Sequence, residues 1–257
     1  MRILWLTIVG VCGLVTWAAA ACPPGSENSS VEVGPLCIDQ YEASVWSIPN
    51  QKTTNAPLVE KVRNGTATRN DLNAGGATQL GTAASDYPCK DNGNNCKNKI
   101  FAVSIPGVTP ARFITWFQAQ MACANALALL PTNAEWQVAA QGTPDPGVAP
   151  GCNVSSGVVH QTGASAECKS KWGAVDMVGN VTEWVADWLV QATDCSDPIF
   201  PATGDLNCMG GATTTQGPAA IHRGGHFGSG TSAGVFAIEG DNPTNDAAAT
   251  RGFRCRR

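Results

Sequence analysis

The sequence predicts one compact, disulfide-rich domain with few helices and much ordered coil. Glycine (28 residues) and proline (16) favour turns over long regular elements, while 43% hydrophobic residues are enough to form a core. Of the 11 cysteines, all but Cys12 lie outside the apolar amino terminus, an even set that can pair fully in an oxidising compartment. A chain of 257 residues can hold one large domain or two small ones, and only one large domain leaves no unexplained linker. We therefore assign residues 22–257 to a single domain with its core in residues 31–257.

The first 21 residues are typical of a secretory signal peptide. Met1-Arg2 is followed by an apolar run that ends in alanines directly before Cys22, as at a small-residue cleavage site. Two alternatives stay open: a transmembrane anchor, since about 18 apolar residues can just span a bilayer, and a lipoprotein signal that modifies Cys22. Lipidation would leave an odd number of cysteines, which cannot pair completely. We expect an exported protein, periplasmic, secreted or at the cell surface, without an integral membrane span once the signal is cleaved.

The charge of the chain argues against one class of partner. Only 14% of residues are charged, the net charge is -4, and no cluster of lysine and arginine could neutralise a row of phosphates. We therefore expect no nucleic-acid partner.

Few segments have a clear periodic pattern. Residues 51–99 are rich in Asn, Thr, Gly and Ala, which predicts an irregular insertion. The clearest helix runs from Thr115, a candidate N-cap, to Leu129. A second helix is expected to begin at Thr132, where Thr-Asn-Ala-Glu is a capping box, and to end at Gly142.

The segment Trp172–Trp188 is the most informative stretch, because it groups tryptophans and acidic residues around one Gly-Asn step. Side-chain oxygens of Asn180 and Glu183, with a backbone carbonyl between them, would provide the oxygen-only ligation that calcium accepts. The alternative is a helix start, with Asn180 as the N-cap and Glu183 three residues later.

This segment is one of several blocks that occur in a characteristic order. The others are Cys37-Ile-Asp-Gln-Tyr-Glu42, Leu130-Pro-Thr-Asn-Ala-Glu-Trp136, Arg223-Gly-Gly225 and Arg251-Gly-Phe-Arg-Cys255. The ordered set resembles the formylglycine-generating enzyme family, also called the sulfatase-modifying-factor family, and the resemblance extends from Val31 to Cys255.

The resemblance implies a fold and a structural ion. The fold would be α+β, a C-type-lectin-like variant with small twisted antiparallel sheets, few helices and much ordered coil. The calcium ligands that we predict are Gly179, Asn180, Val181 and Glu183, with a second site at Asn153 and Val154.

Members of this family bind copper through two active-site thiolates shortly after the Arg-Gly-Gly block. Counting from the Gly-Gly pair places Ser229 and Gly234 at those positions, and no cysteine lies between Cys208 and Cys255. Neither residue is a soft ligand for Cu(I), so we predict no copper and assign no catalytic residue. A serine hydrolase built on Ser229 is disfavoured, because the surrounding glycines do not form a G-x-S-x-G elbow.

The cysteine spacing favours four local disulfides, although it does not determine connectivity rigorously. The two cysteines that remain are Cys123 and Cys255, and family members similarly join these positions. The local pairs would be Cys22–Cys37, Cys89–Cys96, Cys152–Cys168 and Cys195–Cys208. A zinc–thiolate site is the competing use of cysteine, but the chain has no C-x-x-C pair.

The carboxyl-terminal stretch, residues 226–250, is rich in small and polar side chains, and loops on a rigid body commonly carry recognition. In relatives with this architecture the corresponding surface receives a peptide or other ligand. The candidate ligand-binding residues are His226, Phe227, Ser229, Phe236, Asp241 and Asn242. The alternative is that the polar members of this set simply form turns.

We predict an exported, calcium-stabilised domain of this family that binds an unknown peptide, protein or glycan as a binding or accessory module. Two alternatives stay open. The first is an active oxidoreductase of the same family that modifies a peptide or a secreted small-molecule precursor, and the second is a structural cell-envelope protein.

Overall fold

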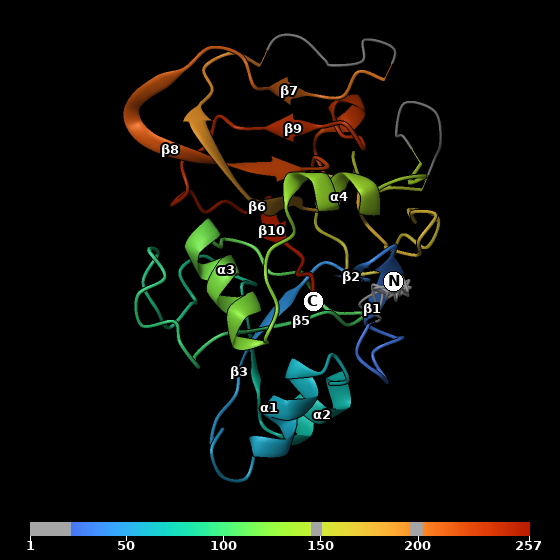
Figure 1. The fold of residues 1–257 in the computed structure, drawn as a ribbon, viewed down its shortest axis with the longest axis vertical. Helices are drawn as coiled ribbons and strands as arrows, with labels where there is room; N and C mark the ends of the chain where they lie inside the picture. Colours follow the sequence, from blue (N-terminus) through green and yellow to red (C-terminus); the bar gives the residue numbers. More distant parts are fainter. Residues whose placement is uncertain (1–21, 145–150, 196–202) are drawn as a thin grey trace, which may run out of the picture.

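The computed structural model describes residues 22–144, 151–195 and 203–257, so the predicted signal peptide lies outside the described residues. The fold is α+β, as predicted, with short helices and small sheets joined by ordered coil (Figure 1). The helices are α1 (Ala56–Arg63), α2 (Arg69–Ala74), α3 (Trp116–Asn125) and α4 (Asn133–Ala139). The strands are β1 (Ser30–Val33), β2 (Leu36–Asp39), β3 (Ser44–Ser47), β4 (Thr78–Leu80), β5 (Phe101–Val103), β6 (Thr182–Gln191), β7 (Asn207–Cys208), β8 (Thr213–Arg223), β9 (Ile238–Glu239) and β10 (Arg251–Phe253).

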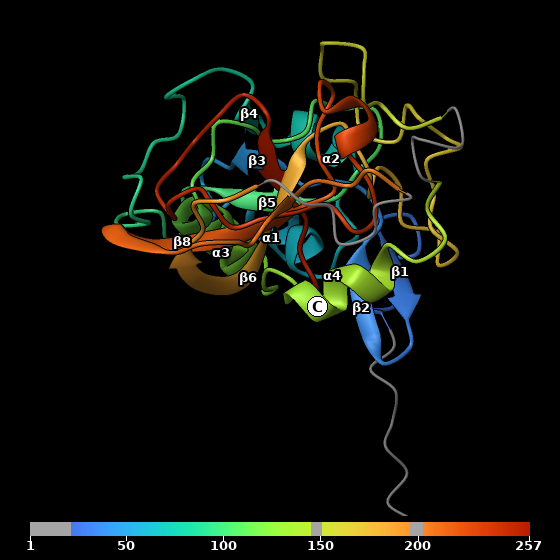
Figure 2. The ribbon, with the colours of Figure 1, turned by 90° about the horizontal axis from the view of Figure 1, so that it is seen from above.

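The strands form three sheets. The largest has the order β10-β6-β8-β9-β7, and the others are β4-β3-β5 and the hairpin β1-β2. In the largest sheet β6 is antiparallel to β8 but parallel to β10, so this sheet is mixed where an antiparallel one was expected. Figure 1 shows it in the upper half of the molecule, with α1 and α2 at the opposite end. The β1-β2 hairpin lies beside α4 and shares a core with it (Figure 2).

Both predicted helix starts are confirmed. Thr115 and Thr132 are the N-caps of α3 and α4, and each forms a capping box with the residue three positions later. Both helices end earlier than predicted. The chain after α3 reverses at Leu127, whose φ of 55° lies in the left-handed region, and α4 ends at Ala139.

Residues 51–99 contain more regular structure than their composition predicts, namely α1, α2 and β4. The reason is the small set of apolar side chains in this stretch. Leu58, Val59 and Val62 form the buried face of α1, and Leu72 is the buried residue of α2. All four pack in one core cluster with Trp46, so tertiary burial outweighs weak local propensity.

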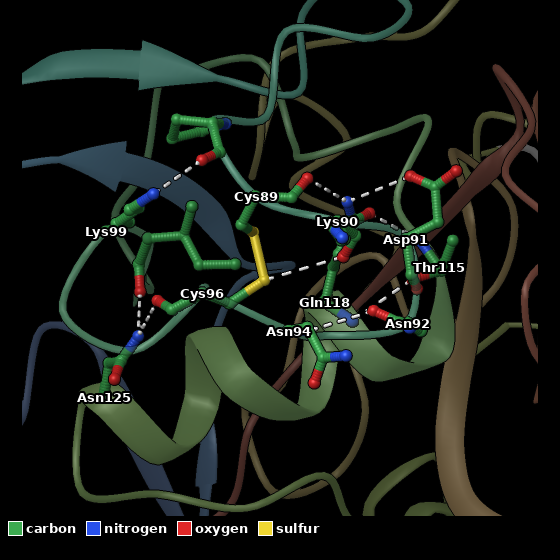
Figure 3. Close-up of a disulfide and its surroundings, with 12 residues drawn as sticks. Cys89, Lys90, Asp91, Asn92, Asn94, Cys96, Lys99, Thr115, Gln118 and Asn125 are labelled. Carbon is green, nitrogen blue, oxygen red and sulfur yellow. Dashed lines mark hydrogen bonds between the residues drawn. A yellow bond between two sulfur atoms is a disulfide. The ribbon is translucent and has the colours of Figure 1, made fainter.

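The loop closed by the Cys89–Cys96 disulfide is fastened to α3 (Figure 3). Thr115 Oγ1 donates to the Asp91 carbonyl oxygen at 2.6 Å, and Asn125 Nδ2 donates to the Cys96 carbonyl oxygen at 3.0 Å. These two bonds, one at each end of α3, provide hydrogen-bond donors for carbonyl oxygens of the irregular loop.

All five predicted disulfides are present. The long-range one, Cys123–Cys255, joins α3 to the chain directly after β10. Its sulfurs lie in the same core cluster as Trp184 and Phe253, so the bond ties the largest sheet to the helical side of the molecule. Within the described ranges, no helix combines the length and hydropathy needed to cross a bilayer.

Candidate functional site

The predicted cation-binding turn lies directly before β6. Gly179 and Asn180 have φ angles of 77° and 55°, and a Cβ on Gly179 would overlap the Asn153 carbonyl group. Position 179 therefore requires glycine, while asparagine is one of the few other residues that tolerate this region. Glu183 lies in β6, so the alternative of a helix start is wrong.

The buried side chain of Asn180 is fully hydrogen-bonded. Its Oδ1 accepts the backbone N–H of His160 at 2.8 Å and Asn153 Nδ2 at 3.0 Å. Its Nδ2 donates to Glu42 Oε2 at 2.5 Å. One carboxamide thus joins three segments that are far apart in the sequence.

The carboxylate of Glu183 is enclosed by donors from the protein. Arg254 Nε and Nη2 donate to its two oxygens at 2.6 to 2.9 Å, and Trp136 Nε1 donates to Oε2 at 2.7 Å. Neither charged side chain is more than 1% exposed. The cation that this carboxylate binds is therefore a guanidinium.

These contacts involve the side-chain oxygens of the predicted ligand set. The side-chain oxygens of Asn180 and Glu183 have separate protein partners, and Asn153 Oδ1 accepts the Ser156 hydroxyl. In this arrangement a cation shared by Asn180 and Glu183 would have to displace these donors. The contacts do not involve the backbone oxygens of Gly179 and Val181, the other ligands predicted for that site, and Asn153 and Val154 stay the prediction for a second site.

Three further carboxylates near Arg254 were missed by the sequence reasoning. Asp39, Glu42 and Asp176 are each at most 2% exposed. Burial raises the pKa of Asp39 and of Asp176 to about 6. Burial, together with the neighbouring charge of Asp176, raises the pKa of Glu42 well above its ordinary value. The sequence did contain a signal for Asp39 and Glu42, because both acids belong to the Cys37-Ile-Asp-Gln-Tyr-Glu42 block.

Three of the predicted ligand residues form one turn. Ser229 Oγ accepts the backbone N–H of His226 at 2.9 Å, while His226 Nδ1 accepts the backbone N–H two residues later at 3.1 Å. Phe227 rests edge-on against the His226 ring, with the centroids 5.4 Å apart. Neither bond joins the serine hydroxyl to the imidazole, so the turn does not present a serine–histidine dyad.

The two positions at which copper thiolates were expected hold Ser229 and Gly234. A Cβ on Gly234 would overlap the Asp205 carboxylate, whose Oδ2 accepts the backbone N–H of Phe236 at 2.7 Å. Phe236, another predicted ligand residue, is thus fixed through its backbone to Asp205. Every cysteine in the described ranges is in a disulfide, so the donors present do not fit Cu(I).

The remaining predicted ligand residues, Asp241 and Asn242, lie beside His222 and Glu239. His222 Nδ1 is 3.6 Å from Glu239 Oε1, and its Nε2 is 3.2 Å from Asn242 Nδ2. Burial lowers the pKa of His222 well below its ordinary value. Burial and the charge of Asp241 raise the pKa of Glu239 to about 7. The structure therefore divides the predicted ligand residues between two places, the His226 turn and this cluster, with Phe236 held separately.

An apolar groove of about 430 Å³ follows β6 and β8. It is lined by Trp188, Leu189, Val190, Thr213, Thr214, Gly217 and Pro218. Trp188 and Val190 are 45% and 54% exposed, which is unusual for side chains of this size. The sequence analysis included Trp188 as the last residue of the Trp172–Trp188 segment, but the sequence gave no signal of this groove.

Aromatic side chains of α3 adjoin the groove. Trp188 packs edge-on against Trp116 and Phe117, with ring centroids 4.9 and 5.6 Å apart. The carboxyl-terminal stretch borders both features, because the Thr244 carbonyl oxygen accepts the backbone N–H of Trp116 and Pro243 forms a bridge with Ala219 of β8. Pro243 and Thr244 are thus joined through their backbone to β8 and α3, the elements that carry part of the groove lining and two rings of the aromatic trio Trp116, Phe117 and Trp188.

Comparison with known proteins gives a family match and several structural likenesses. A family model described as a sulfatase-modifying factor enzyme 1-like domain matches residues 31–257. The formylglycine-generating enzyme of Thermomonospora curvata is 30% identical over 171 residues, which are 57% of this chain and 54% of that enzyme. The chain therefore spans about half the length of that curated relative.

Several solved structures resemble the chain at lower sequence identity. The Major Tropism Determinant U1 variant has a TM-score of 0.48 at 19% identity, over 86% of this chain and 50% of that one. CarF has a TM-score of 0.44 at 16% identity, over 86% and 85% of the two chains. PvdO from Pseudomonas aeruginosa has a TM-score of 0.42 at 16% identity, over 86% and 80%.

Proposed function

Because the chain belongs to the sulfatase-modifying-factor family, whose domain model matches residues 31–257, we propose that it is an exported binding or accessory module without copper oxidase activity. The observation that carries the proposal is the donor set at the two expected thiolate positions. Ser229 and Gly234 offer no thiol, and the Asp205 carboxylate fills the space that a side chain at 234 would need.

The surface that supports binding is the apolar groove with its aromatic trio. Trp188 lines the groove, packs in the trio and is still 45% exposed, and tryptophan often dominates binding energy because its large ring is apolar and rigid. The polar stretch from Asp241 to Thr244 borders the apolar lining, which is the combination that small binding sites use for affinity and orientation. The ligand class remains a peptide, a protein or a glycan.

Export is supported by the five disulfides, since such bonds persist mainly in oxidising compartments. The Cys22 sulfur is bonded to Cys37, which leaves no thiol at position 22 for a lipid. Calcium stabilisation is not part of this proposal, because the Glu183 carboxylate is bound by Arg254.

The absence of oxidase activity is tested with Cu(I) and a cysteine-containing peptide substrate of formylglycine-generating enzymes. The enzyme of Thermomonospora curvata is the positive control and is expected to generate formylglycine, the aldehyde product, as its name states. We expect this protein to form no aldehyde and to retain no Cu(I) after gel filtration. Aldehyde formation, or one equivalent of retained Cu(I), would support the alternative of an active oxidoreductase.

The binding surface is tested by screening the purified protein against peptide and glycan arrays. The double variant Trp188→Ala/Val190→Ser is expected to weaken binding of any ligand found by about 30-fold or more, the loss typical of a tryptophan at the centre of an interface. Val158→Ser is the matched control, since it also replaces an exposed valine but lies in a different segment. Equal binding by the double variant and the wild type would place the ligand elsewhere, and no ligand at all would favour a structural role.

A further inference from the structure

The strands β8 and β9 lie side by side in the largest sheet (Figure 1). Their pairing brings three side chains with metal-binding groups together. His222 in β8 lies directly opposite Glu239 in β9, and Asp241 follows just after that strand. A ring nitrogen of His222 and one carboxylate oxygen from each acid lie within 4.8 Å of one another. An ion bound by all three atoms would lie about 2.0 to 2.2 Å from each of them, so the two carboxylates would close around it.

His222 distinguishes this cluster from an ordinary group of surface acids. The side chain is 1% exposed, and its Nδ1 has no hydrogen-bond partner among the described residues. This nitrogen faces Glu239 Oε1 at 3.6 Å, beyond hydrogen-bonding distance. A buried polar atom without a partner is unfavourable, and an ion held between the two residues would satisfy it.

The imidazole is already oriented by its other neighbours. Trp184 packs edge-on against the ring, with centroids 5.0 Å apart, and Asn242 Nδ2 lies 3.2 Å from Nε2. Metal-binding histidines commonly use the second ring nitrogen in this way, because its partner fixes the tautomer and the ring orientation. With an ion at Nδ1, Nε2 carries the proton, and the Asn242 carboxamide would turn its oxygen toward the ring. That turn also releases Asp241 Oδ1, which now accepts from Asn242.

The cluster is open to solvent on the side of the two acids. Glu239 and Asp241 are both partly exposed, so an ion could enter and water could complete its coordination. Arg251, a neighbouring cation, is paired with Asp246 at 2.5 Å, so part of its charge is neutralised.

We propose that His222, Glu239 and Asp241 form a binding site for a divalent transition-metal ion, namely zinc. One imidazole and two carboxylates with an open fourth position match zinc, which takes nitrogen and oxygen ligands in tetrahedral geometry. Calcium is a poorer match because it takes six to eight oxygen ligands. The site is separate from the expected thiolate positions and from the Asn180 turn.

The test is a calorimetric titration of ZnCl2 into the purified protein after metal removal. We expect one zinc ion per chain. Asp241→Asn and Glu239→Gln should each raise the Kd at least about 10-fold. Glu60→Gln, which removes an exposed carboxylate from α1, is the matched control and should leave the Kd unchanged. His222→Gln should abolish zinc binding. Because the His222 ring is buried, this variant could fail to fold, in which case Asp241→Asn and Glu239→Gln decide the test.

Two readouts separate coordination from a merely structural role. Cobalt(II) bound at the site should give a visible absorption spectrum that changes in Glu239→Gln, and Asn242→Ala should weaken zinc about 10-fold by removing the partner of Nε2. An absence of zinc binding, or equal zinc affinity in Asp241→Asn and the wild type, would overturn the proposal. Binding of calcium in place of zinc would overturn it as well. None of these outcomes bears on the Cu(I) and aldehyde assay, because zinc is not a redox metal.

Discussion

At the scale of single residues, Arg254 is the counterion of a buried acidic centre. It binds Glu183 directly, while Asp39, Glu42 and Asp176 are buried nearby. The sequence could indicate that Asn180 and Glu183 build a site, because a Gly-Asn step with an acid three residues later is distinctive. It could not indicate which cation the acid binds, since Arg254 lies 71 residues further along the chain and a carboxylate can bind either a guanidinium or a metal ion.

We expect Glu183→Gln to lower the free energy of unfolding by about 3 to 5 kcal/mol, because it leaves the Arg254 charge buried without its partner. Urea denaturation followed by tryptophan fluorescence measures the change. Glu60→Gln on the exposed face of α1 is the control and should leave the stability unchanged. A loss below about 1 kcal/mol for Glu183→Gln would show that the pair behaves like a surface salt bridge.

Asp39 makes stability depend on pH. Burial raises its pKa from 3.8 to about 6, so the folded state holds this proton more tightly than the unfolded state. The stabilising contribution is therefore complete below pH 3.8 and is lost as the pH rises through 6. At 1.36 kcal/mol per pKa unit, the loss is at most about 3 kcal/mol. We expect Asp39→Asn to flatten the fall in unfolding free energy between pH 4 and 7, and an identical slope in this variant would contradict the assignment.

Calcium should not stabilise the folded state through the Asn180 turn. The side-chain oxygen of Asn180 and both oxygens of Glu183 already accept hydrogen bonds from protein donors. We expect the Tm of the metal-free protein to stay constant when CaCl2 is added. A saturable rise in Tm that disappears in Asn180→Ala would instead establish the predicted calcium site.

At the scale of elements, sequence located the beginnings of helices better than their ends. Capping boxes at Thr115 and Thr132 are local signals that need no tertiary context. The end of α3 depends on the left-handed turn at Leu127, and α1 depends on burial against Trp46, neither of which a local pattern contains. The position at which α4 begins also determines where Trp136 lies, and the Nε1 of this residue donates a hydrogen bond to Glu183 in the acidic centre.

We expect Thr132→Ala to destabilise the protein by about 1 kcal/mol, because the first turn of α4 loses its capping hydroxyl. Thr132→Ser keeps the hydroxyl and is the matched control. Thermal unfolding measures both variants. If alanine and serine gave the same Tm, the cap would contribute nothing to the stability of the folded state.

At the scale of the whole molecule, long-range connections hold a body made largely of coil. The cysteine spacing predicted the four local disulfides because short loops allow few alternatives, and the fifth followed from the remaining pair and the family resemblance. The parallel pairing of β10 with β6 was not predicted, since the strands are separated by β7, β8 and β9 and neither has a distinctive periodicity.

The disulfides should contribute unequally to stability. In the chain-entropy account, a bond that closes 132 residues contributes about 5 kcal/mol, and one that closes 7 residues contributes about 2 kcal/mol. We therefore expect Cys123→Ala/Cys255→Ala to lower the denaturation midpoint more than Cys89→Ala/Cys96→Ala. The two double variants control for each other in the same urea experiment. A larger loss for the short loop would show that its contacts with α3, not loop entropy, set the contribution.

The order in which the buried charges are synthesised has a consequence for the nascent polypeptide. A ribosome adds about 5 to 20 residues per second, and Arg254 is made after Asp39, Glu42, Asp176 and Glu183. Before Arg254 is synthesised, the four acidic side chains lack their shared counterion, and burying them away from water is unfavourable. The chain that precedes Arg254 is therefore expected to keep these acids hydrated, and they become buried together only after the guanidinium has been added.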